Sequence, residues 1–466
     1  MSDEVVAAPG AAGAGAERLD VARLDVTGLG AAYGAGRLTP LDAVEAFLER
    51  IDRFNPALNA FLALRRDAAL EEARASTERW RAGAPLSSLD GVPYGVKANI
   101  AVEDLPWHGG VAAYRDRVAE KDAACVSLLR KGGAIALGTL NMHEGALGAV
   151  TDNPHFGRCG NPWKEGATPG GSSGGSGAAV AAGLCAFALG TDTMGSVRIP
   201  SAYCGIAAHK PSKGAVPAEG LIDLSPTLDH IGPHAHTIAD LMDILPVLTG
   251  RPAAPASAAP APIDLRIGIA FWGGAVDVDS AVAEAHEEAK RIAKRIGPTA
   301  RVDLSGIDFG AFRRKGLLVS EVEGFAAHQP MLARRPEGFS PAFRDLLEWG
   351  ARQPPEKIDA AYAGIRLAGA RLAALFAEER VDVIMTPATP QGPFDFADAV
   401  PANQADFTAM ANFAGAPATV LPASRRGAPP ASVQFIAPKG RDDIALAAAR
   451  AFEEARGEAP RPPGYF

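Results

Sequence analysis

Residues 169–198 read PGGSSGGSGAAVAAGLCAFALGTDTMGSVR, and this stretch predicts the centre of the fold. Two Gly/Ser segments, 169–177 and 190–198, enclose an apolar run of small residues from Ala178 to Leu189. That run fits a buried helix followed by a short buried strand. Each Gly/Ser loop then lies at an end of one packed unit, with hydroxyls and backbone N–H groups gathered between them. Such a pocket suits chemistry on a carbonyl group, although a Gly/Ser loop can equally cradle phosphate.

Strands and helices alternate on both sides of this stretch, which indicates an α/β fold with a largely covered sheet. Thr39 and Asp42 form a capping-box pattern at the start of a helix over 39–51, which we expect to end at Asn55-Pro56. We expect further helices over 66–81, 122–131, 237–248 and 279–295, mostly helical structure over 309–377, and strands over 134–138, 265–270 and 381–387.

The chain is predicted to form one domain over 19–466, after a disordered tail over 1–18. The Pro/Ala-rich segment 251–262 is typical of a linker or a surface crossing. The strands on its far side read like additions to the same sheet, so it does not divide the chain into two domains.

Composition excludes several classes of function. The 466 residues are 47% hydrophobic and 21% charged, as in an ordinary globular protein with ample core. The net charge of −8 argues against binding nucleic acid or an anionic membrane. The start of the chain lacks a secretory signal, and no long apolar run predicts a membrane span, so we expect a cytoplasmic protein.

Cysteines and histidines give no metal signature. The four cysteines have no CxxC spacing and are expected to be free thiols, and the nine histidines form no HExxH motif or ligand cluster. The sequence therefore predicts neither a metal nor another cofactor.

Lys97 stands among the strand-forming residues Tyr94, Val96 and Ile100. Such a lysine usually extends its ammonium group to solvent. The alternative is a desolvated lysine whose pKa falls far enough for it to act as a neutral base.

A serine nucleophile needs a base to take its proton, and that base is usually histidine. No histidine stands in a GxSxG motif or at the spacing of a triad. A Ser-Lys arrangement is the remaining option, and it requires a buried neutral lysine, a hydroxyl and backbone donors for an oxyanion.

Three motifs together resemble the amidase signature family: GVPYGVK at 91–97, GGSSGGSG at 170–177 and GTDTMGSVRIP at 190–200. The spacings of 75 residues from Lys97 to Ser172 and 24 from Ser172 to Ser196 agree with that family. The resemblance covers roughly residues 25 to 450. It implies a single large α/β domain with a central mixed sheet covered by helices on both faces. It also implies a catalytic core over about 63–250 and 375–450 and a variable, substrate-shaping segment over about 251–375.

The resemblance implies a Ser-cisSer-Lys hydrolase. Ser196 would be the nucleophile that forms an acyl-enzyme, Ser172, after a cis peptide bond, would relay the proton, and Lys97 would be the base. The backbone N–H groups of Thr193, Met194, Gly195 and Ser196 would form the oxyanion hole. Three further residues would have supporting roles: Ser173 as a hydrogen bonder, and Asp192 and Arg198 as a structural ion pair.

Two positions depart from the family pattern. Ala98 stands where the residue after the lysine is commonly Asp, and Met194 stands where relatives often have Gly. If position 194 needs a positive φ, methionine is costly there; if its side chain faces the pocket, it helps to shape specificity.

The resemblance leaves the substrate less defined. Asn141-Met142-His143-Glu144 resembles the stretch found in indoleacetamide-type and mandelamide-type hydrolases, whereas amidotransferase subunits tend to have Asp in place of His143. We therefore expect a cofactor-independent hydrolase of a small-molecule amide, releasing ammonia or an amine. A homodimer is compatible with this assignment, and direct contact with nucleic acid or a membrane is not expected. The alternatives are the glutamine-hydrolysing component of a tRNA-dependent amidotransferase, a carboxybiuret- or allophanate-type hydrolase, and a non-catalytic amide-binding homologue.

Overall fold

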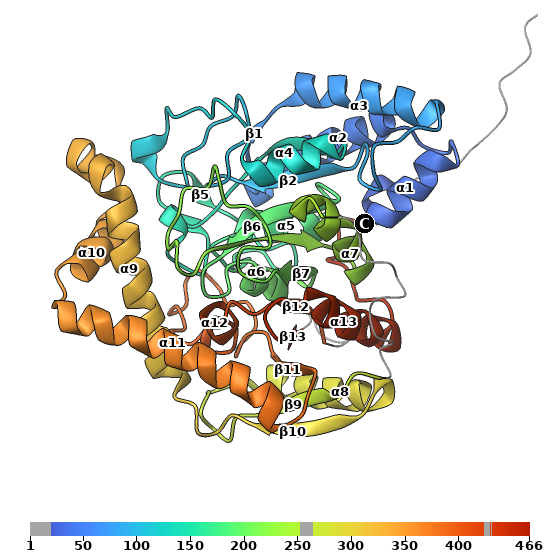
Figure 1. Ribbon diagram of the computed structural model, residues 1–466. Coiled ribbons are helices and arrows are strands. Elements are labelled where there is room, and N and C mark those ends of the chain that lie inside the picture. The colour runs from blue at the N-terminus through green and yellow to red at the C-terminus, as the bar shows by residue number, and fades with distance from the viewer. Residues whose placement is uncertain (1–19, 252–263, 424–428, 430) are drawn as a thin grey trace, which may run out of the picture.

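The computed structural model describes residues 20–251, 264–423, 429 and 431–466. The predicted disordered tail and nearly all of the predicted linker over 251–262 lie outside the described residues. The chain runs from the first helices at one end of the molecule to a C-terminal helix packed beside the sheet (Figure 1).

One mixed sheet extends through the whole molecule, as predicted. Its strand order is β1-β3-β2-β6-β8-β7-β12-β13-β11-β9-β10, and it takes in strands from both sides of the Pro/Ala segment. Its strands are β1 (Phe61–Leu64), β2 (Pro93–Lys97), β3 (Ile135–Leu140), β6 (Phe187–Asp192), β7 (Ala207–Lys210), β8 (His230–Ala235), β9 (Ile267–Phe271), β10 (Thr299–Asp303), β11 (Val383–Pro387), β12 (Ala418–Pro422) and β13 (Ser432–Ile436). A separate small sheet pairs β4 (Asp152–Asn153) with β5 (Gly157–Arg158).

Helices cover both faces of the sheet, which confirms the predicted α/β architecture (Figure 1). They are α1 (Val26–Gly34), α2 (Pro40–Leu58), α3 (Arg66–Arg81), α4 (Ala124–Lys131), α5 (Gly174–Ala181), α6 (Arg198–Cys204), α7 (Ile238–Thr249), α8 (Ser280–Ile296), α9 (Phe309–Arg334), α10 (Pro341–Ala351), α11 (Pro355–Glu378), α12 (Asp406–Phe413) and α13 (Asp442–Arg456).

The helix α2 begins as predicted but ends later than predicted. Thr39 and Asp42 form the expected capping box. Pro56 does not stop the helix; it lies in the last turn, and Asn59, with φ 49°, ends the helix by donating its N–H to the carbonyl of Asn55. The Asn55 side chain then accepts from the N–H groups of the two residues that lead into β1, so the chain turns after this extra turn of helix.

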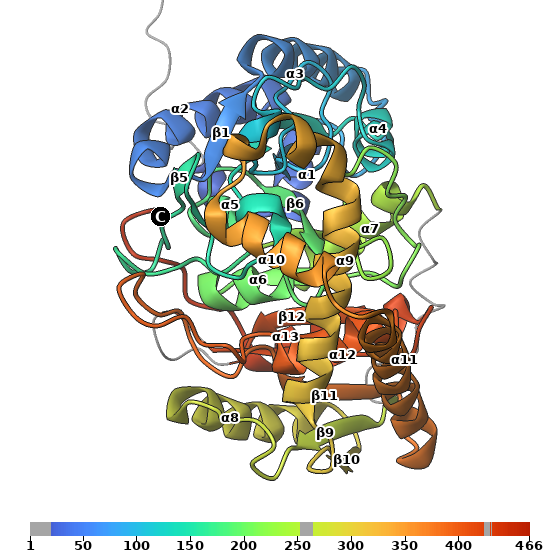
Figure 2. The same cartoon turned by 90° about the vertical axis from the view of Figure 1, so that its left-hand side faces the viewer.

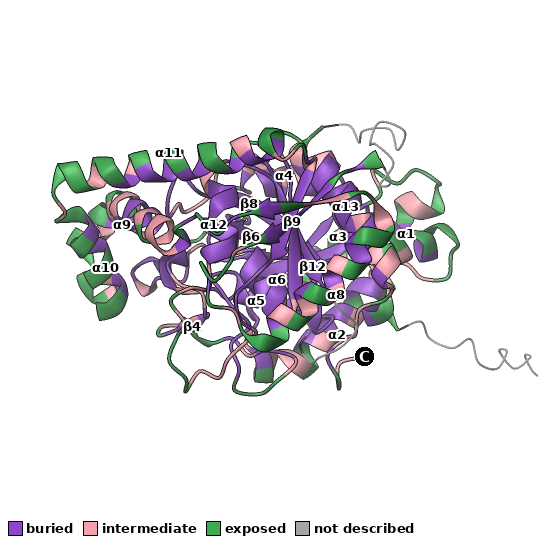
Figure 3. Cartoon of the chain, turned by 90° about the horizontal axis from the view of Figure 1, so that it is seen from below, coloured by how far each residue is buried: buried purple, intermediate pink, exposed green. Residues whose placement is uncertain are grey.

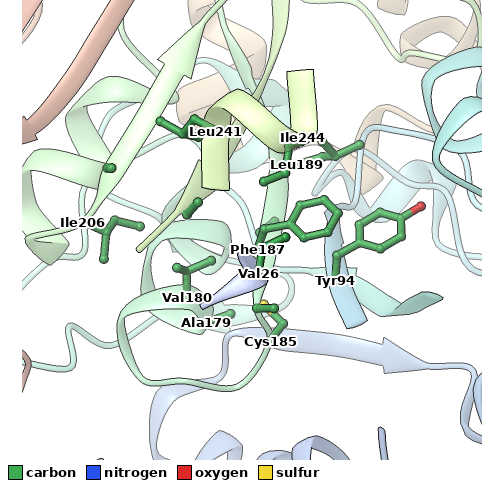
Figure 4. Close-up of a cluster of buried hydrophobic side chains, with 14 of the residues drawn as sticks. Val26, Tyr94, Ala179, Val180, Cys185, Phe187, Leu189, Ile206, Leu241 and Ile244 are labelled. Atoms are coloured by element: carbon green, nitrogen blue, oxygen red, sulfur yellow. The ribbon is translucent and has the colours of Figure 1, made fainter. Parts of the chain in front are cut away.

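The predicted helix–strand unit at the centre is α5 followed by β6, and both are buried throughout. Figure 3 shows the buried elements gathered in the middle of the molecule, with the exposed residues on the outer helices. Tyr94 of β2 stacks on Phe187 of β6 at 4.8 Å between ring centroids (Figure 4). The four cysteines are buried free thiols, as predicted. This dense packing holds the ends of β2 and β6 in place.

Three helices, α9, α10 and α11, stand on one side of the molecule, where they lie in front of the sheet in Figure 2. The helix α11 is long and apolar enough to cross a membrane by length and composition, a test that buried helices of soluble proteins also pass. It packs along α9 and α12. The start of α9 thereby reaches the loops at the sheet's centre.

The strand order determines where the site forms. Strands β2 and β6 are parallel neighbours, so their carboxyl ends meet at the same edge of the sheet. Strand β8 is antiparallel to β6, and its first residue, His230, pairs with Asp192, the last residue of β6. Lys97, Asp192 and the loop before β8 therefore converge at one place, as expected of a ligand site in an α/β sheet.

Candidate active site

Lys97, at the end of β2, is completely buried and does not reach solvent. Its Nζ lies 2.7 Å from Ser172 Oγ and 2.7 Å from Thr191 Oγ1. Burial lowers the pKa of Lys97 to about 7, although the nearby carboxylates of Asp229 and Asp192 oppose the shift. The structure therefore shows the desolvated lysine and excludes the solvent-directed alternative.

Ser172 lies in the loop before α5, and the Gly171–Ser172 peptide bond is cis, as the resemblance implied. The Ser172 carbonyl accepts a hydrogen bond from the His143 N–H at 3.0 Å. A Cβ atom at Gly171 would lie 2.6 Å from the Val150 nitrogen, so the close approach of these two loops requires glycine. Ser172 is thus held by the backbone on both sides.

Ser173 joins the two Gly/Ser loops. Its hydroxyl donates to the Thr191 carbonyl at 3.1 Å and accepts from the Thr191 N–H at 3.2 Å. Its own N–H donates to the Ser196 carbonyl at 3.3 Å. These bonds place the loop that carries Ser172 beside the turn that carries Ser196.

The turn over 192–197 is shaped by the Asp192 carboxylate, which accepts from the Gly195 N–H at 2.7 Å and the Val197 N–H at 3.2 Å. The Gly195 N–H was predicted to face an oxyanion, but it is directed at Asp192 instead. The N–H groups of Thr193, Met194 and Ser196 donate to no other described residue. These three groups are therefore the available donors of the predicted oxyanion hole.

The predicted ion pair of Asp192 and Arg198 is present and completely buried, with two contacts of 2.9 and 3.0 Å. Burial by itself would raise the pKa of Asp192, but the Arg198 guanidinium holds it below its ordinary value. Two residues not predicted from the sequence complete the cluster. Asn412 donates to both the carbonyl and the carboxylate of Asp192, and Gln434 accepts from Arg198 at 2.9 Å.

Asp229 is a second buried carboxylate that the motifs did not indicate as part of the site. It accepts from the Thr193 hydroxyl and from the N–H groups of Leu224 and Ser225. Burial raises the pKa of Asp229, and these hydrogen bonds oppose that shift. Asp229 therefore anchors the first residue of the predicted oxyanion hole while acting electrostatically on Lys97.

Ser196 faces a cavity of about 120 Å³ between the central loops and the first turns of α9. Met194 lines this cavity and is not among the residues of positive φ, so methionine is accommodated there without left-handed backbone. Ala98, the other departure, is buried in an apolar cluster with Val111 and Met142. The cavity is lined by Ala146, Leu147, Gly148, Ala149, Thr193, Met194, Ser196, Ile199, Leu224, Arg313, Leu317, Ser320, Pro401, Ala402, Gln404 and Ala405.

The described residues contain no group of three or more His, Cys, Asp or Glu side chains that could hold a metal ion. The chemistry available at this site is that of the lysine, the two serines and the backbone donors. A carbonyl carbon beside Ser196 would face a hydroxyl on one side and N–H groups on the other, which is the arrangement that acyl transfer needs.

Comparison with known proteins gives a consistent result. The Amidase family profile matches residues 42–446. The A-type subunit of the glutamyl-tRNA(Gln) amidotransferase of Coxiella burnetii is 32% identical over 440 residues, which cover 86% of this chain and 90% of that protein. The corresponding protein of Chloroflexus aggregans is 43% identical, but the match spans about half of each chain, 51% and 49%.

A solved structure is similar over nearly the whole length. The native peptide amidase from Stenotrophomonas maltophilia superimposes with a TM-score of 0.83 and 26% sequence identity, covering 96% of this chain and 99% of that one.

Proposed function

The chain belongs to the amidase family, and from the geometry of its site we propose that it hydrolyses the C–N bond of a small, linear carboxylic amide to a carboxylate and ammonia or an amine. The observation that carries this proposal is the 2.7 Å contact between Lys97 Nζ and Ser172 Oγ in a fully buried setting. A lysine with a pKa of about 7 is neutral in a large fraction of molecules near neutral pH. It can therefore take a proton that lysine in water would not.

In the proposed acylation, Ser196 Oγ attacks the amide carbonyl carbon. Its proton passes to Ser172 Oγ as the Ser172 proton passes to Lys97 Nζ. Negative charge develops on the carbonyl oxygen, where the N–H groups of Thr193, Met194 and Ser196 stabilise it, each such donor contributing about 3 kcal/mol. The C–N bond then breaks, and the leaving amine takes a proton back along the same route.

Deacylation follows the same path with water as the nucleophile. Water attacks the acyl carbon, gives up a proton through Ser172 to Lys97, and the Ser196–acyl bond breaks as Ser196 recovers its proton. The products are the carboxylate and the free enzyme, and no redox step or added group is required.

A second candidate function is favoured by the names of the curated relatives: the A-type subunit of a glutamine-dependent amidotransferase. Such a protein would release ammonia from glutamine for a partner protein. The described cavity lining favours the first candidate, because it contains no Asp or Glu to pair with the α-ammonium group of glutamine.

The test is ammonia release by the purified chain from a panel of short primary amides and from glutamine. We expect turnover of small amides by the chain alone. Turnover of glutamine alone, rising when amidotransferase partner proteins are added, would instead support the second candidate. Absence of ammonia from every amide under both conditions would contradict both.

A further inference from the structure

Arg313 is the one charged side chain lining the cavity that contains Ser196, among the residues that the structure describes. It comes from the first turn of α9, and its side chain is 13% exposed. Most of the remaining lining is apolar, including Leu147, Leu224 and Leu317. A cation in such a wall requires a nearby counter-charge, because an unpaired charge is costly to bury.

The counter-charge is Asp406, at the start of α12, which pairs with Arg313 Nη1 and is itself 6% exposed. Asp406 does not line the cavity, so it lies behind the guanidinium as seen from Ser196. This position holds the arginine in place and leaves its outer side toward the cavity.

The guanidinium has donors to spare. Only Nη1 of Arg313 bonds to a described residue, and that residue is Asp406. Its Nε and Nη2 donate to no other described residue, yet they are not among the buried polar atoms that lack a partner, so solvent reaches them. A planar fork with open N–H groups matches the two oxygens of a carboxylate.

We propose that Arg313 is a substrate-binding residue that selects amides whose acyl chain ends in a carboxylate, that is, monoamides of short dicarboxylic acids. This inference rests on the proposed function, since it names the substrate class of the same site. The cavity of about 120 Å³ equals the share of about four water molecules in the liquid, so the chain must be short. The lack of an acidic lining residue excludes a matching site for an ammonium group on that chain.

Three probes that differ by one group test this assignment. Glutaramate carries the carboxylate, pentanamide replaces it with a methyl group, and glutamine adds an α-ammonium group to glutaramate. We expect glutaramate to have the highest kcat/KM in the wild-type protein, by about 10- to 100-fold over pentanamide, as for a hydrogen-bonded charge pair. We expect glutamine to fall well below glutaramate.

The variant Arg313→Met should abolish the preference for glutaramate over pentanamide, so that the ratio of the two kcat/KM values approaches one. Because this variant leaves Asp406 buried without its partner, the double variant Arg313→Met/Asp406→Asn provides a form without that unpaired charge, and the same ratio should fall in it. Arg314→Met is the matched control: Arg314 is the exposed neighbour outside the cavity lining, and its removal should leave the preference unchanged.

The outcomes separate the two proposals. Hydrolysis of pentanamide with no preference for glutaramate, or a preference that persists in both Arg313 variants, would overturn the role of Arg313 and leave the amidase proposal standing. A higher kcat/KM for glutamine than for glutaramate would also overturn it, since an ammonium group would then be recognised. Failure to hydrolyse any amide would contradict the proposed function itself.

Discussion

Lys97 Nζ and Ser172 Oγ lie 2.7 Å apart although 75 residues separate them in the chain. The parallel pairing of β2 and β6 brings the lysine to the end of β6, and Ser173 ties the Ser172 loop to Thr191 of that strand. The contact is therefore a product of the sheet and the two Gly/Ser loops together. Its chemical value depends on the charge of Lys97.

The first prediction concerns the pH dependence of catalysis. Since Lys97 must be neutral to accept a proton and its pKa is about 7, kcat/KM should rise with pH and level off above about 7. The Asp229 carboxylate favours the charged lysine, so Asp229→Asn should move the midpoint to lower pH. A pH–rate profile of both proteins checks this, and a midpoint that stays in place or moves upward in Asp229→Asn would contradict it.

The second prediction concerns stability. The pKa of Lys97 is about 7 in the folded protein and near 10.5 when unfolded, so the unfolded chain holds the extra proton between these pH values. The stability contribution of Lys97 therefore rises with pH, by up to about 1.4 kcal/mol per pH unit in this window. The difference in free energy of unfolding between wild type and Lys97→Met isolates this slope, because other groups cancel. A difference that is constant from pH 7 to 10 would contradict a buried neutral lysine.

The third prediction concerns the buried ion pair. Arg198→Met leaves the Asp192 carboxylate buried without its cation, which typically costs about 3–5 kcal/mol. Arg198→Lys should restore little, because the guanidinium contacts Asp192, Asn412 and Gln434 at once. Denaturant unfolding measures both variants, and an Arg198→Met protein within about 1 kcal/mol of wild type would contradict this account.

The fourth prediction separates backbone conformation from steric contact in the turn. Gly195 has φ 138°, and a Cβ there would lie 2.3 Å from Thr408 Oγ1. Gly214 also has positive φ, 78°, but nothing lies within 4 Å of its added Cβ. Gly214→Ala should therefore cost about 1–2 kcal/mol with unchanged kcat, whereas Gly195→Ala should disrupt the turn and abolish measurable turnover. Equal activities of the two variants would show that the turn does not depend on glycine.

The local parts of the fold were predictable because their signals are local. Thr39 and Asp42 mark a helix start within four residues, and the apolar run before Thr191 marks α5 and β6. The site was predictable as far as its motifs extend, from Lys97 to Arg198. Asn412 and Gln434 could not be found in this way, since they lie more than 200 residues from Arg198 and carry no local pattern.

Two other features depend on three-dimensional contacts. The Gly195 N–H would have been assigned correctly only with the position of the Asp192 carboxylate, which the sequence does not contain. The role of Arg313 depends on where the start of α9 meets the central loops, and a lone arginine in a helix reads as a solvated residue. Met194 became interpretable only when its backbone angle and its place in the cavity wall were known.

Covalent trapping by a fluorophosphonate tests the central assignment most directly. Intact-mass spectrometry should show one adduct per chain in the wild-type protein, mapping to Ser196, and none in Ser196→Ala. Ser172→Ala and Lys97→Ala should react more slowly by about 10²–10⁴-fold, as expected when proton transfer is lost. An adduct that persists in Ser196→Ala, or labelling of Lys97→Ala at the wild-type rate, would contradict the assignment of Ser196 as nucleophile and Lys97 as base.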